Sequence, residues 1–508
     1  MKLPFAVRPA SCIAIVLLNW AAIAPSSAKS ADADTADAEH ELIGVKASKT
    51  SVHTQHPDAQ WYPEAGLGLF IHWGISSVKD MYISWPMIQG GALAKKRIAD
   101  PAERERIIRE EDWNLKGDKP EITPNQYWDM AKEFNPQKYD PDKWCKAAKE
   151  AGFTYAVLTA KHHDGFALWP SAYGDYNTSN FMGGRDLVKE YVEACRRNGI
   201  KVGLYFSGPD WHFDRDYMSF LYSGARKMNP EFPTLDTNLK PYISKKSQEE
   251  IDKHQAEFSA LVNGQIEELL TRYGKIDLIW FDGRPTAGDN KPITQERIRE
   301  LQPGILISPR LHGSGDFFTY ERKLTIKKPV KGWAEFCNPW TSCWSHKDLP
   351  FRAPFSVLGD LVLSRSVGVN YLLGVGPMGD GQFCDGIYQN LDAISGWMKL
   401  NRTAVTTAKP LASAERASVP ATASELTRYL FVVPQSKGRF PKDLLPPTDV
   451  TVTLSGVAKP TRVILTSDGS ALKYSYADST ITIQLPAAKR SQLVDVVQID
   501  LSATAPHK

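Results

Sequence analysis

The sequence predicts an α/β fold class, a (β/α)8-type barrel followed by a C-terminal antiparallel β-sandwich. From about residue 61 to residue 401, short apolar runs alternate with amphipathic segments, which indicates a parallel sheet covered by helices. At least six such apolar runs in about 320 residues favour a barrel over an open sheet. After Asn401 the pattern changes to short strands with alternating faces, which predicts a second, all-β domain.

The first 28 residues have the pattern of a signal peptide, which predicts a secreted or periplasmic protein. Lys2 and Arg8 give a positive start, an apolar stretch spans 12–23, and the small residues 26–28 form a cleavage site. The apolar stretch is too short to span a membrane comfortably, and no second stretch of that length follows. We therefore expect no membrane anchoring. Residues 29–60 are polar and without periodicity, and are predicted to form a flexible leader.

Composition excludes some functions and leaves others open. The chain has 508 residues, so a large catalytic domain (61–401) with a smaller domain (402–508) is expected. The formal net charge of +3 argues neither for nor against a polyanionic partner, whereas the lack of a long basic block argues against nucleic-acid binding. The 14 tryptophans fit either a large core or a surface that stacks on sugar rings. Composition does not determine whether the protein forms an oligomer.

The elements of the predicted barrel can be assigned in order. Strands are expected at residues 66–73, 155–160, 201–206, 276–282, 305–310 and 369–375, and helices at 140–152, 186–199 and 247–273. The first of these helices has Asp140 as N-cap, Pro141 in its first turn and Gly152 at its end. The second domain is expected to have strands at 428–433, 450–454, 462–466, 480–485 and 494–501. We expect this domain to lack catalytic residues and to brace the barrel.

Polar residues recur where these barrel strands end. Catalytic residues of such barrels come from the carboxyl ends of several strands, so these side chains should line one pocket. The residues are His72, His162, His163, Tyr205, Asp282 and Arg310.

Two kinds of chemistry are open to this cluster. Asp282 is either a catalytic carboxylate or a structural residue at a strand end, and glycoside hydrolysis would require a second carboxylate, from Glu321, Glu335 or Asp316. The adjacent His162 and His163 could bind a metal, support the fold or hydrogen-bond ligand hydroxyls. Neighbours on a strand point to opposite faces and no third ligand has a suitable spacing, so no metal is expected. Glycoside hydrolysis by two carboxylates also needs no organic cofactor, so none is expected.

Five cysteines follow the predicted signal peptide, so at least one is unpaired. They are Cys145, Cys195, Cys337, Cys343 and Cys384, and their spacing matches no zinc site. Cys145 and Cys195 are expected to be core residues. Cys337 and Cys343 are close enough in sequence to form a disulfide.

Together these segments resemble glycoside hydrolase family 29, the α-L-fucosidases, over most of the chain after Trp61. The most specific match is Leu158-Thr159-Ala160-Lys161-His162-His163-Asp164-Gly165-Phe166, continuing to Leu168-Trp169-Pro170-Ser171. Shorter matches are Phe70-Ile71-His72-Trp73-Gly74, Arg185-Asp186-Leu187-Val188, Gly203-Leu204-Tyr205-Phe206-Ser207, Trp280-Phe281-Asp282-Gly283 and Gly368-Val369-Asn370-Tyr371-Leu372-Leu373.

The resemblance implies a retaining, exo-acting enzyme that releases terminal α-L-fucose from fucosylated glycans. It implies Asp282 as nucleophile and Glu321 as acid/base, the latter because Asp316-Phe317-Phe318-Thr319-Tyr320-Glu321 matches the family's stretch before that glutamate. The sugar pocket would then be lined by His72, Trp85, His162, His163, Tyr205, Trp280 and Arg310.

Two departures from the family concern the substrate range. The family usually has a glutamate before the tryptophan that here is Trp85, and this chain has Ser84. A charged insertion from about residue 95 to 119 enlarges a loop on the same side. We therefore expect weaker binding of free fucose, or a glutamate supplied from another loop. The alternatives are a related retaining glycosidase, such as one for α-galactosides, and a non-catalytic carbohydrate-binding homologue.

Overall fold

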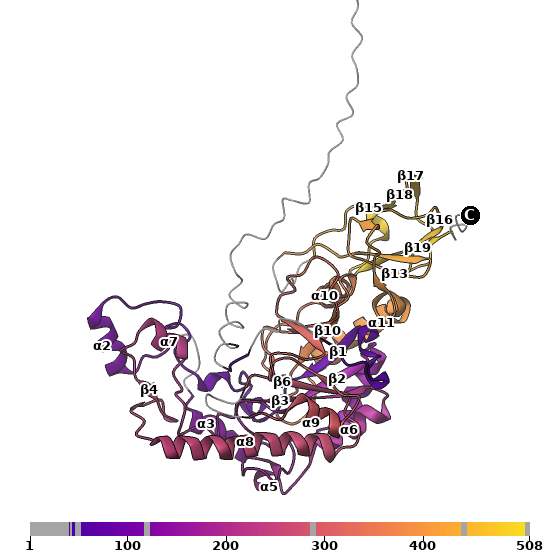
Figure 1. The fold of residues 1–508 in the computed structure, drawn as a ribbon. Coiled ribbons are helices and arrows are strands. Elements are labelled where there is room, and N and C mark those ends of the chain that lie inside the picture. Colours follow the sequence, from indigo (N-terminus) through magenta and orange to yellow (C-terminus); the bar gives the residue numbers. More distant parts are fainter. Residues whose placement is uncertain are drawn as a thin grey trace, which may run out of the picture.

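A computed structural model describes residue 40 and residues 43–45, 52–115, 122–284, 291–437 and 444–502. The expected signal peptide and the start of the expected leader lie outside these residues. Figure 1 shows a helix-covered sheet in the lower part of the molecule and a smaller all-β part above it. Among the described helices, none is long and apolar enough to cross a membrane.

The lower part is a nearly closed barrel of eight parallel strands, as the sequence predicts. Its order is β7-β6-β3-β2-β1-β10-β9-β8, and every neighbouring pair is parallel. The strands are β1 (Leu67–Ile71), β2 (Tyr155–Lys161), β3 (Lys201–Ser207), β6 (Leu278–Asp282), β7 (Leu306–Ile307), β8 (Phe317–Glu321), β9 (Trp333–Pro339) and β10 (Asn370–Val375). Most of their residues are buried, because helices cover the outside and side chains fill the inside.

Helices connect these strands and cover the barrel. Asp140 and Asp186 accept backbone hydrogen bonds as N-caps of α4 and α6, and Ser247 forms a capping box with Glu250 at the start of α8. The helices around the barrel are α3 (Pro124–Asp129), α4 (Pro141–Glu150), α5 (Thr178–Phe181), α6 (Leu187–Arg197), α8 (Gln248–Thr271), α9 (Gln295–Leu301), α10 (Pro354–Ser366) and α11 (Asp385–Val405).

A side chain closes the gap in the barrel between β7 and β8. Asp316 is fully buried, its backbone N–H donates to Ile307 O at 2.9 Å, and its carboxylate accepts the N–H of Ile307 at 2.7 Å. Arg299 pairs with the same carboxylate at 2.9 Å. Asp316 is therefore a structural residue of the seam, which explains why it is unsuited to the catalytic role considered above.

The all-β part contains two antiparallel sheets around one apolar core. The sheet order is β11-β13-β14-β19-β16 in one and β12-β15-β18-β17 in the other. The strands are β11 (Lys409–Pro410), β12 (Arg416–Ala417), β13 (Ala421–Ser424), β14 (Thr427–Val432), β15 (Val450–Ser455), β16 (Pro460–Leu465), β17 (Tyr474–Ala477), β18 (Thr480–Leu485) and β19 (Asp495–Leu501). This part contacts α11, where Trp397 donates to the backbone oxygen of Val494 at 2.7 Å.

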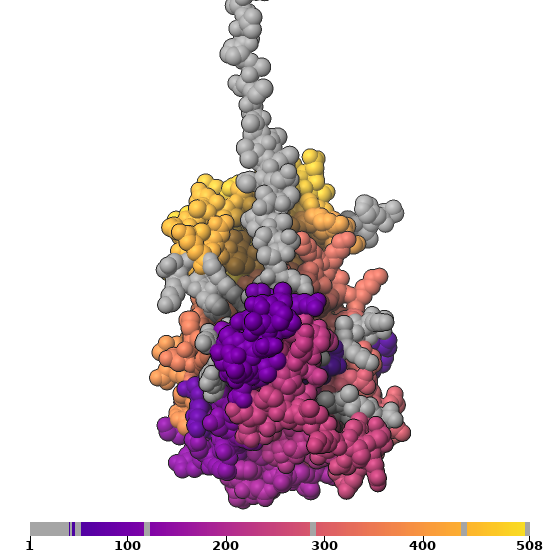
Figure 2. Space-filling view, turned by 90° about the vertical axis from the view of Figure 1, so that its left-hand side faces the viewer, coloured from indigo at the N-terminus to yellow at the C-terminus, as the bar shows by residue number. Residues whose placement is uncertain are grey.

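The charged insertion packs against a second segment that extends from the barrel. The insertion contains α2 (Pro101–Glu110), and the second segment contains α7 (Ser223–Met228), β4 (Thr234–Leu235) and β5 (Pro241–Tyr242). Asn229 accepts the N–H of Ile98 at 2.8 Å, and Arg104 lies 3.6 Å from Glu231. Figure 2 shows the two segments, in purple and magenta, side by side on one face of the molecule.

The structure corrects two expectations about the rest of the chain. Ile43 belongs to the expected flexible leader, yet it is 3% exposed and packs in the barrel core. Cys337 and Cys343 do not form the disulfide considered above, because both are free and buried. Cys145 and Cys195 are core residues whose sulfur atoms lie 3.6 Å apart.

Candidate active site

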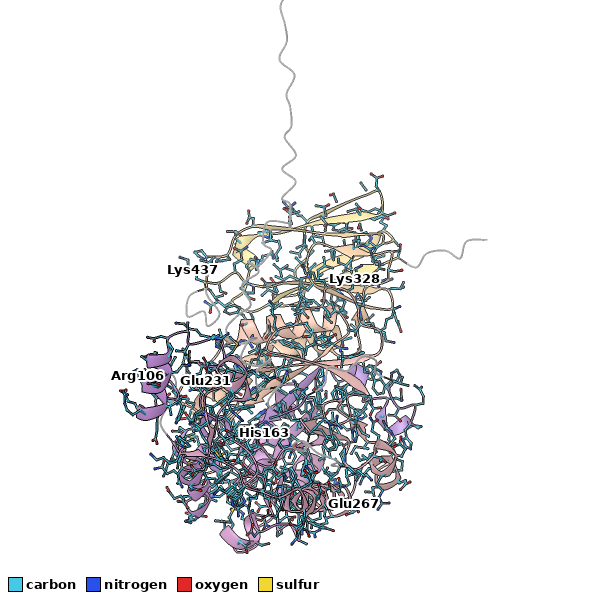
Figure 3. All side chains as sticks on the ribbon, turned by 60° about the vertical axis from the view of Figure 1, so that its left-hand side comes forward. Arg106, His163, Glu231, Glu267, Lys328 and Lys437 are labelled. Atoms are coloured by element: carbon cyan, nitrogen blue, oxygen red, sulfur yellow. The ribbon has the colours of Figure 1, made fainter. Side chains whose placement is uncertain are left out.

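A pocket of about 370 Å3 opens at the carboxyl ends of the barrel strands. It is lined by His40, Ile43, Phe70, His72, Trp85, His162, Tyr205, Trp280, Asp282, Arg310, Glu321, Cys337 and Trp344. His163 is fully buried beside this lining, and Figure 3 labels it in the barrel half of the molecule. The structure thus brings together all nine residues that the sequence selected for the site.

Asp282 is held at the pocket by the end of a central strand. It is the last residue of β6 and 8% exposed. Tyr205 O–H donates to Oδ2 at 2.8 Å and Arg310 Nη1 donates to Oδ1 at 2.9 Å. Gly283 follows with φ of +73°, and a Cβ there would lie 2.5 Å from Ile43 O, so the turn after Asp282 requires glycine. The carboxylate is therefore fixed in one orientation.

Arg310 joins the two proposed catalytic carboxylates. Its Nη2 donates to Glu321 Oε2 at 2.7 Å while its Nη1 binds Asp282. The guanidinium also stacks 4.6 Å from the centre of the Trp280 ring. A planar, permanently charged group suits this bridging role, since it fixes the direction of each hydrogen bond.

Glu321 has a second partner from the N-terminal segment. His40 Nε2 lies 2.8 Å from Glu321 Oε2, and Ile43 O accepts the N–H of Arg284, next to the Asp282 turn, at 2.9 Å. Burial alone would raise the pKa of Glu321, but Arg310 and His40 outweigh it and hold this pKa well below its usual range. Glu321 is therefore ionised in this arrangement.

His162 is anchored by the serine that departs from the family pattern. Ser84 Oγ lies 2.6 Å from His162 Nδ1 and 2.9 Å from Asp164 Oδ2. The carboxylate that Ser84 contacts belongs to an aspartate that does not line the pocket, so Asp164 is not the replacement glutamate expected from another loop. Burial, with His163 and His72 nearby, lowers the pKa of His162 well below its usual value, so its ring is neutral.

The two adjacent histidines lie together rather than on opposite faces. Their ring centres are 4.0 Å apart, because both residues follow the last residue of β2. His163 Nδ1 contacts Ser207 Oγ at 2.7 Å, and its Nε2 lies 3.8 Å from Asp282 Oδ2. Ligand atoms of both histidines and Asp282 lie within 4.8 Å of one another. Arg310 and Tyr205 each donate one hydrogen bond to the Asp282 carboxylate of this group.

Aromatic rings form the rest of the lining. His72 stacks on Trp344 at 4.8 Å, and Tyr205 stacks on both Trp280 at 5.6 Å and His162 at 5.4 Å. Burial lowers the pKa of His72 to about 3, although Asp282 and Glu321 oppose this. These neutral rings offer flat apolar faces together with hydrogen-bonding atoms, a combination that suits sugar rings.

Glu335 lies in the barrel interior and not in the pocket lining. It is 1% exposed and accepts hydrogen bonds from Tyr155 at 2.5 Å, Trp280 at 2.8 Å and Tyr62 at 3.2 Å. Burial raises its pKa. Its two oxygens are occupied by fixed donors, so it supports Trp280 from below instead of facing a ligand.

Sequence reasoning missed several residues of the lining. Trp344 follows β9, so its place in a loop after a barrel strand was a usable signal. His40 and Ile43 gave none, because they lie in a polar segment without periodicity. Cys337 also lines the pocket, and burial raises the pKa of its thiol well above the usual value, which leaves it unreactive.

A barrel whose pocket combines two carboxylates, an arginine between them and a lining of aromatic and imidazole rings has the groups that a glycoside hydrolase requires. A family model described as α-L-fucosidase matches residues 35–403. The chain belongs to the α-L-fucosidase family.

Relatives and solved structures agree with this assignment. The tissue α-L-fucosidase of Rattus norvegicus is 26% identical over 377 residues, which cover 70% of this chain and 71% of the relative. The α-L-fucosidase of Branchiostoma floridae is 26% identical over 465 residues, covering 86% and 91%. The structure of α-L-fucosidase isoenzyme 1 from Paenibacillus thiaminolyticus is 26% identical, has a TM-score of 0.65, and covers 88% of this chain and 99% of its own.

One further structure shares the fold and records a reaction intermediate. It is a trapped covalent intermediate of an α-L-fucosidase from Bacteroides thetaiotaomicron, in complex with 2-fluoro-fucosyl fluoride. It is 23% identical, with a TM-score of 0.63, and covers 90% of this chain and 99% of its own.

Proposed function

We propose that the protein is a retaining, exo-acting α-L-fucosidase that removes terminal α-L-fucose from glycans through a covalent fucosyl-enzyme. Asp282 is the nucleophile and Glu321 is the acid/base. The observation that carries this proposal is the single guanidinium of Arg310, which binds both carboxylates. Two carboxylates held close together at one pocket are what a double displacement requires.

The mechanism follows from how each carboxylate is held. Asp282 attacks the anomeric carbon, and the bond to the leaving oxygen breaks as Glu321 gives that oxygen a proton. A water then loses a proton to Glu321 and attacks the anomeric carbon, which releases Asp282. The pKa of Glu321 is held low, so its carboxylate is ionised, which is the state that the second step requires. The first step requires the protonated form. The side chains that lower the pKa of Glu321 therefore set the pH range in which the first step runs.

The small pocket supports exo action on one terminal sugar. Its lining supplies hydrogen-bonding atoms from His72, His162 and Arg310, and aromatic faces from Trp85 and Trp280. Cleavage of α-L-fucosides is the activity named for the relatives, and the covalent intermediate trapped in the Bacteroides thetaiotaomicron enzyme supports a retaining mechanism for this chain. The fucosylated glycan is therefore the proposed substrate.

One experiment on aryl glycosides distinguishes the proposed function from its alternatives. Wild-type protein is tested on aryl α-L-fucosides and aryl α-D-galactosides, beside an Asp282→Ala variant. We expect fucoside hydrolysis that the variant lacks. Preferred hydrolysis of the galactoside would change the assigned sugar. Sugar binding without turnover of any substrate by the wild type would support a carbohydrate-binding protein instead of an enzyme.

The signal-peptide pattern of residues 1–28 supports a secreted or periplasmic location, which we also propose. Fractionation of cells that express the full chain would test it. Intact residues 1–28 on the mature protein, detected by N-terminal sequencing, would contradict it.

A further inference from the structure

Three side chains form a short hydrogen-bonded chain behind the pocket. Ser84 Oγ lies 2.9 Å from Asp164 Oδ2 and 2.6 Å from His162 Nδ1, and it accepts the backbone N–H of Asp164 at 3.0 Å. Ser84, Asp164 and His162 are 0%, 3% and 6% exposed. A hydroxyl has one proton to donate and two lone pairs, so these three contacts satisfy Ser84 completely.

Two arrangements of the protons satisfy every contact in this chain. With Asp164 ionised, Ser84 O–H donates to the carboxylate and Ser84 Oγ accepts from Nδ1–H of His162. With Asp164 protonated, its O–H donates to Ser84 Oγ, and Ser84 O–H donates to Nδ1 of His162. The imidazole then carries its one proton on Nε2.

The protons balance between the two arrangements. A proton that reaches Nε2 of His162 from the pocket releases the Nδ1 proton to Ser84, and the proton of Ser84 passes to Asp164. The ring stays neutral throughout and only the position of its proton changes. Because Nδ1 faces Ser84 while His162 lines the pocket, Nε2 is the ring nitrogen left for a ligand.

The surroundings allow Asp164 to change its charge in a physiological range. Burial raises the pKa of Asp164 to about 6, while the N–H of Phe166 and Ser84 oppose this rise. Asp210 also raises this pKa and Lys161 lowers it, and these two form a buried ion pair at 3.0 Å. The other titratable groups facing the chain are Tyr127 and Tyr176 near Asp164, and His72, His163 and Tyr205 near His162.

We propose that Ser84 is a positioning residue that couples the protonation of Asp164 to the tautomer of His162. The pocket-facing nitrogen of His162 is then a hydrogen-bond acceptor at higher pH and a donor at lower pH. Ser84 stands where the family resemblance leads us to expect a glutamate, so the device belongs to this chain. The proposal rests on the proposed function only for the identity of the sugar that His162 meets.

The tautomer can be observed directly by nitrogen NMR of protein labelled with 15N in histidine. The His162 signals are identified by their loss in a His162→Gln variant, and spectra are recorded from pH 4.5 to 8. Two variants test the chain. Ser84→Gly removes the hydroxyl at a residue whose φ of +56° glycine tolerates well. Asp164→Asn places an amide donor where the protonated carboxyl would donate, and its oxygen can still accept the N–H of Phe166.

The matched control is Ser77→Ala. Ser77 is 2% exposed, and within the described parts of the chain its hydroxyl has no hydrogen-bond partner. The control therefore removes a buried serine hydroxyl near the same end of the barrel without touching the three-residue chain. It should behave as the wild type does.

In the wild type we expect Nε2 of His162 to change from an unprotonated to a protonated nitrogen as the pH falls through about 6. Asp164→Asn should show protonated Nε2 at every pH, and Ser84→Gly should lose the change near pH 6. One unchanged tautomer in the wild type, or an unaltered transition in Ser84→Gly, would overturn the proposal.

Binding of L-fucose gives a second readout. A changed neutral hydrogen bond alters affinity by about 2- to 12-fold, so the wild type at pH 7.5 should differ by this factor from Asp164→Asn, and the two should converge at pH 5. A constant ratio across this range would count against the coupling. The NMR readout requires no turnover, so a failure of fucoside hydrolysis would reject the proposed function and leave the tautomer result standing.

Discussion

The two proposed catalytic carboxylates are held by different parts of the barrel. Asp282 ends β6, a strand with β3 and β7 on either side, and the side chains that bind it come from neighbouring strand ends. Glu321 ends β8, the edge strand at the seam, and one of its partners, His40, is 281 residues away in sequence. The carboxylate of Asp282 is therefore held by side chains from the neighbouring strands, whereas that of Glu321 also binds a side chain from a distant part of the sequence.

The largest expected effect tests whether Asp282, and not Glu321, is the nucleophile. Asp282→Gly should lower kcat by about 10⁴-fold, because no group remains to attack the anomeric carbon. Azide can enter the space left by the side chain and attack once, so the product should be the β-fucosyl azide. The configuration of the azide product, measured by proton NMR, is the test. An α product from this variant would remove Asp282 from the role of nucleophile.

The next effect concerns which glutamate is the acid/base. Glu321→Gly should slow hydrolysis of a poor leaving group by about 10²–10⁴-fold and give the α-fucosyl azide with an activated substrate and azide. Glu335→Gln is the matched comparison. It leaves the pocket groups in place but disturbs three buried hydrogen bonds, so it should lower Tm more than Glu321→Gly does. Near-normal turnover of the poor leaving group by Glu321→Gly would reverse the assignment.

A smaller effect tests the distant partner of Glu321. His40 helps to lower the pKa of Glu321, so His40→Ala should raise that pKa. The alkaline limb of the pH profile of kcat/KM reports loss of the proton from the catalytic acid, and this limb should therefore move to higher pH. The control is His56→Ala, a nearby histidine that instead accepts the N–H of Asp58. An alkaline limb that stays in place would show that His40 does not influence the acid.

The smallest effect on catalysis is expected far from the pocket. Trp397→Phe removes the hydrogen bond to the carbonyl of Val494 and should lower stability by about 0.5–1.5 kcal/mol, with kcat/KM unchanged within about two-fold. Differential scanning calorimetry beside the exposed control Tyr474→Phe measures this. If Tm stays at the control value, the all-β part does not brace the barrel through α11.

The sequence predicts the fold and the Asp282 side of the site well, because those signals are local. The strand that ends at Asp282 and the run from Leu158 to Phe166 combine apolar strand patterns with reactive residues at their ends. The orientation of the adjacent histidines His162 and His163 depends on where β2 ends, which the sequence does not mark. The expectation that His162 and His163 face opposite ways holds within a strand, but both lie just beyond the end of β2.

The Glu321 side could not be predicted fully, because its parts are distant in sequence and individually ordinary. Nothing local marks His40 as a partner of Glu321. Likewise, Asp316 and Glu335 looked like catalytic candidates because both follow the strand ending at Arg310. Only burial and hydrogen-bond partners show that one closes the seam and the other supports Trp280.

The contact between His40 and Glu321 can form only late in the synthesis of the chain. At about 5–20 residues per second, a ribosome adds Glu321 about 14–56 s after His40. For that interval the N-terminal segment has no carboxylate to bind and no finished barrel to pack against. The part of the pocket lining that His40 forms is therefore completed only after most of the barrel has been translated.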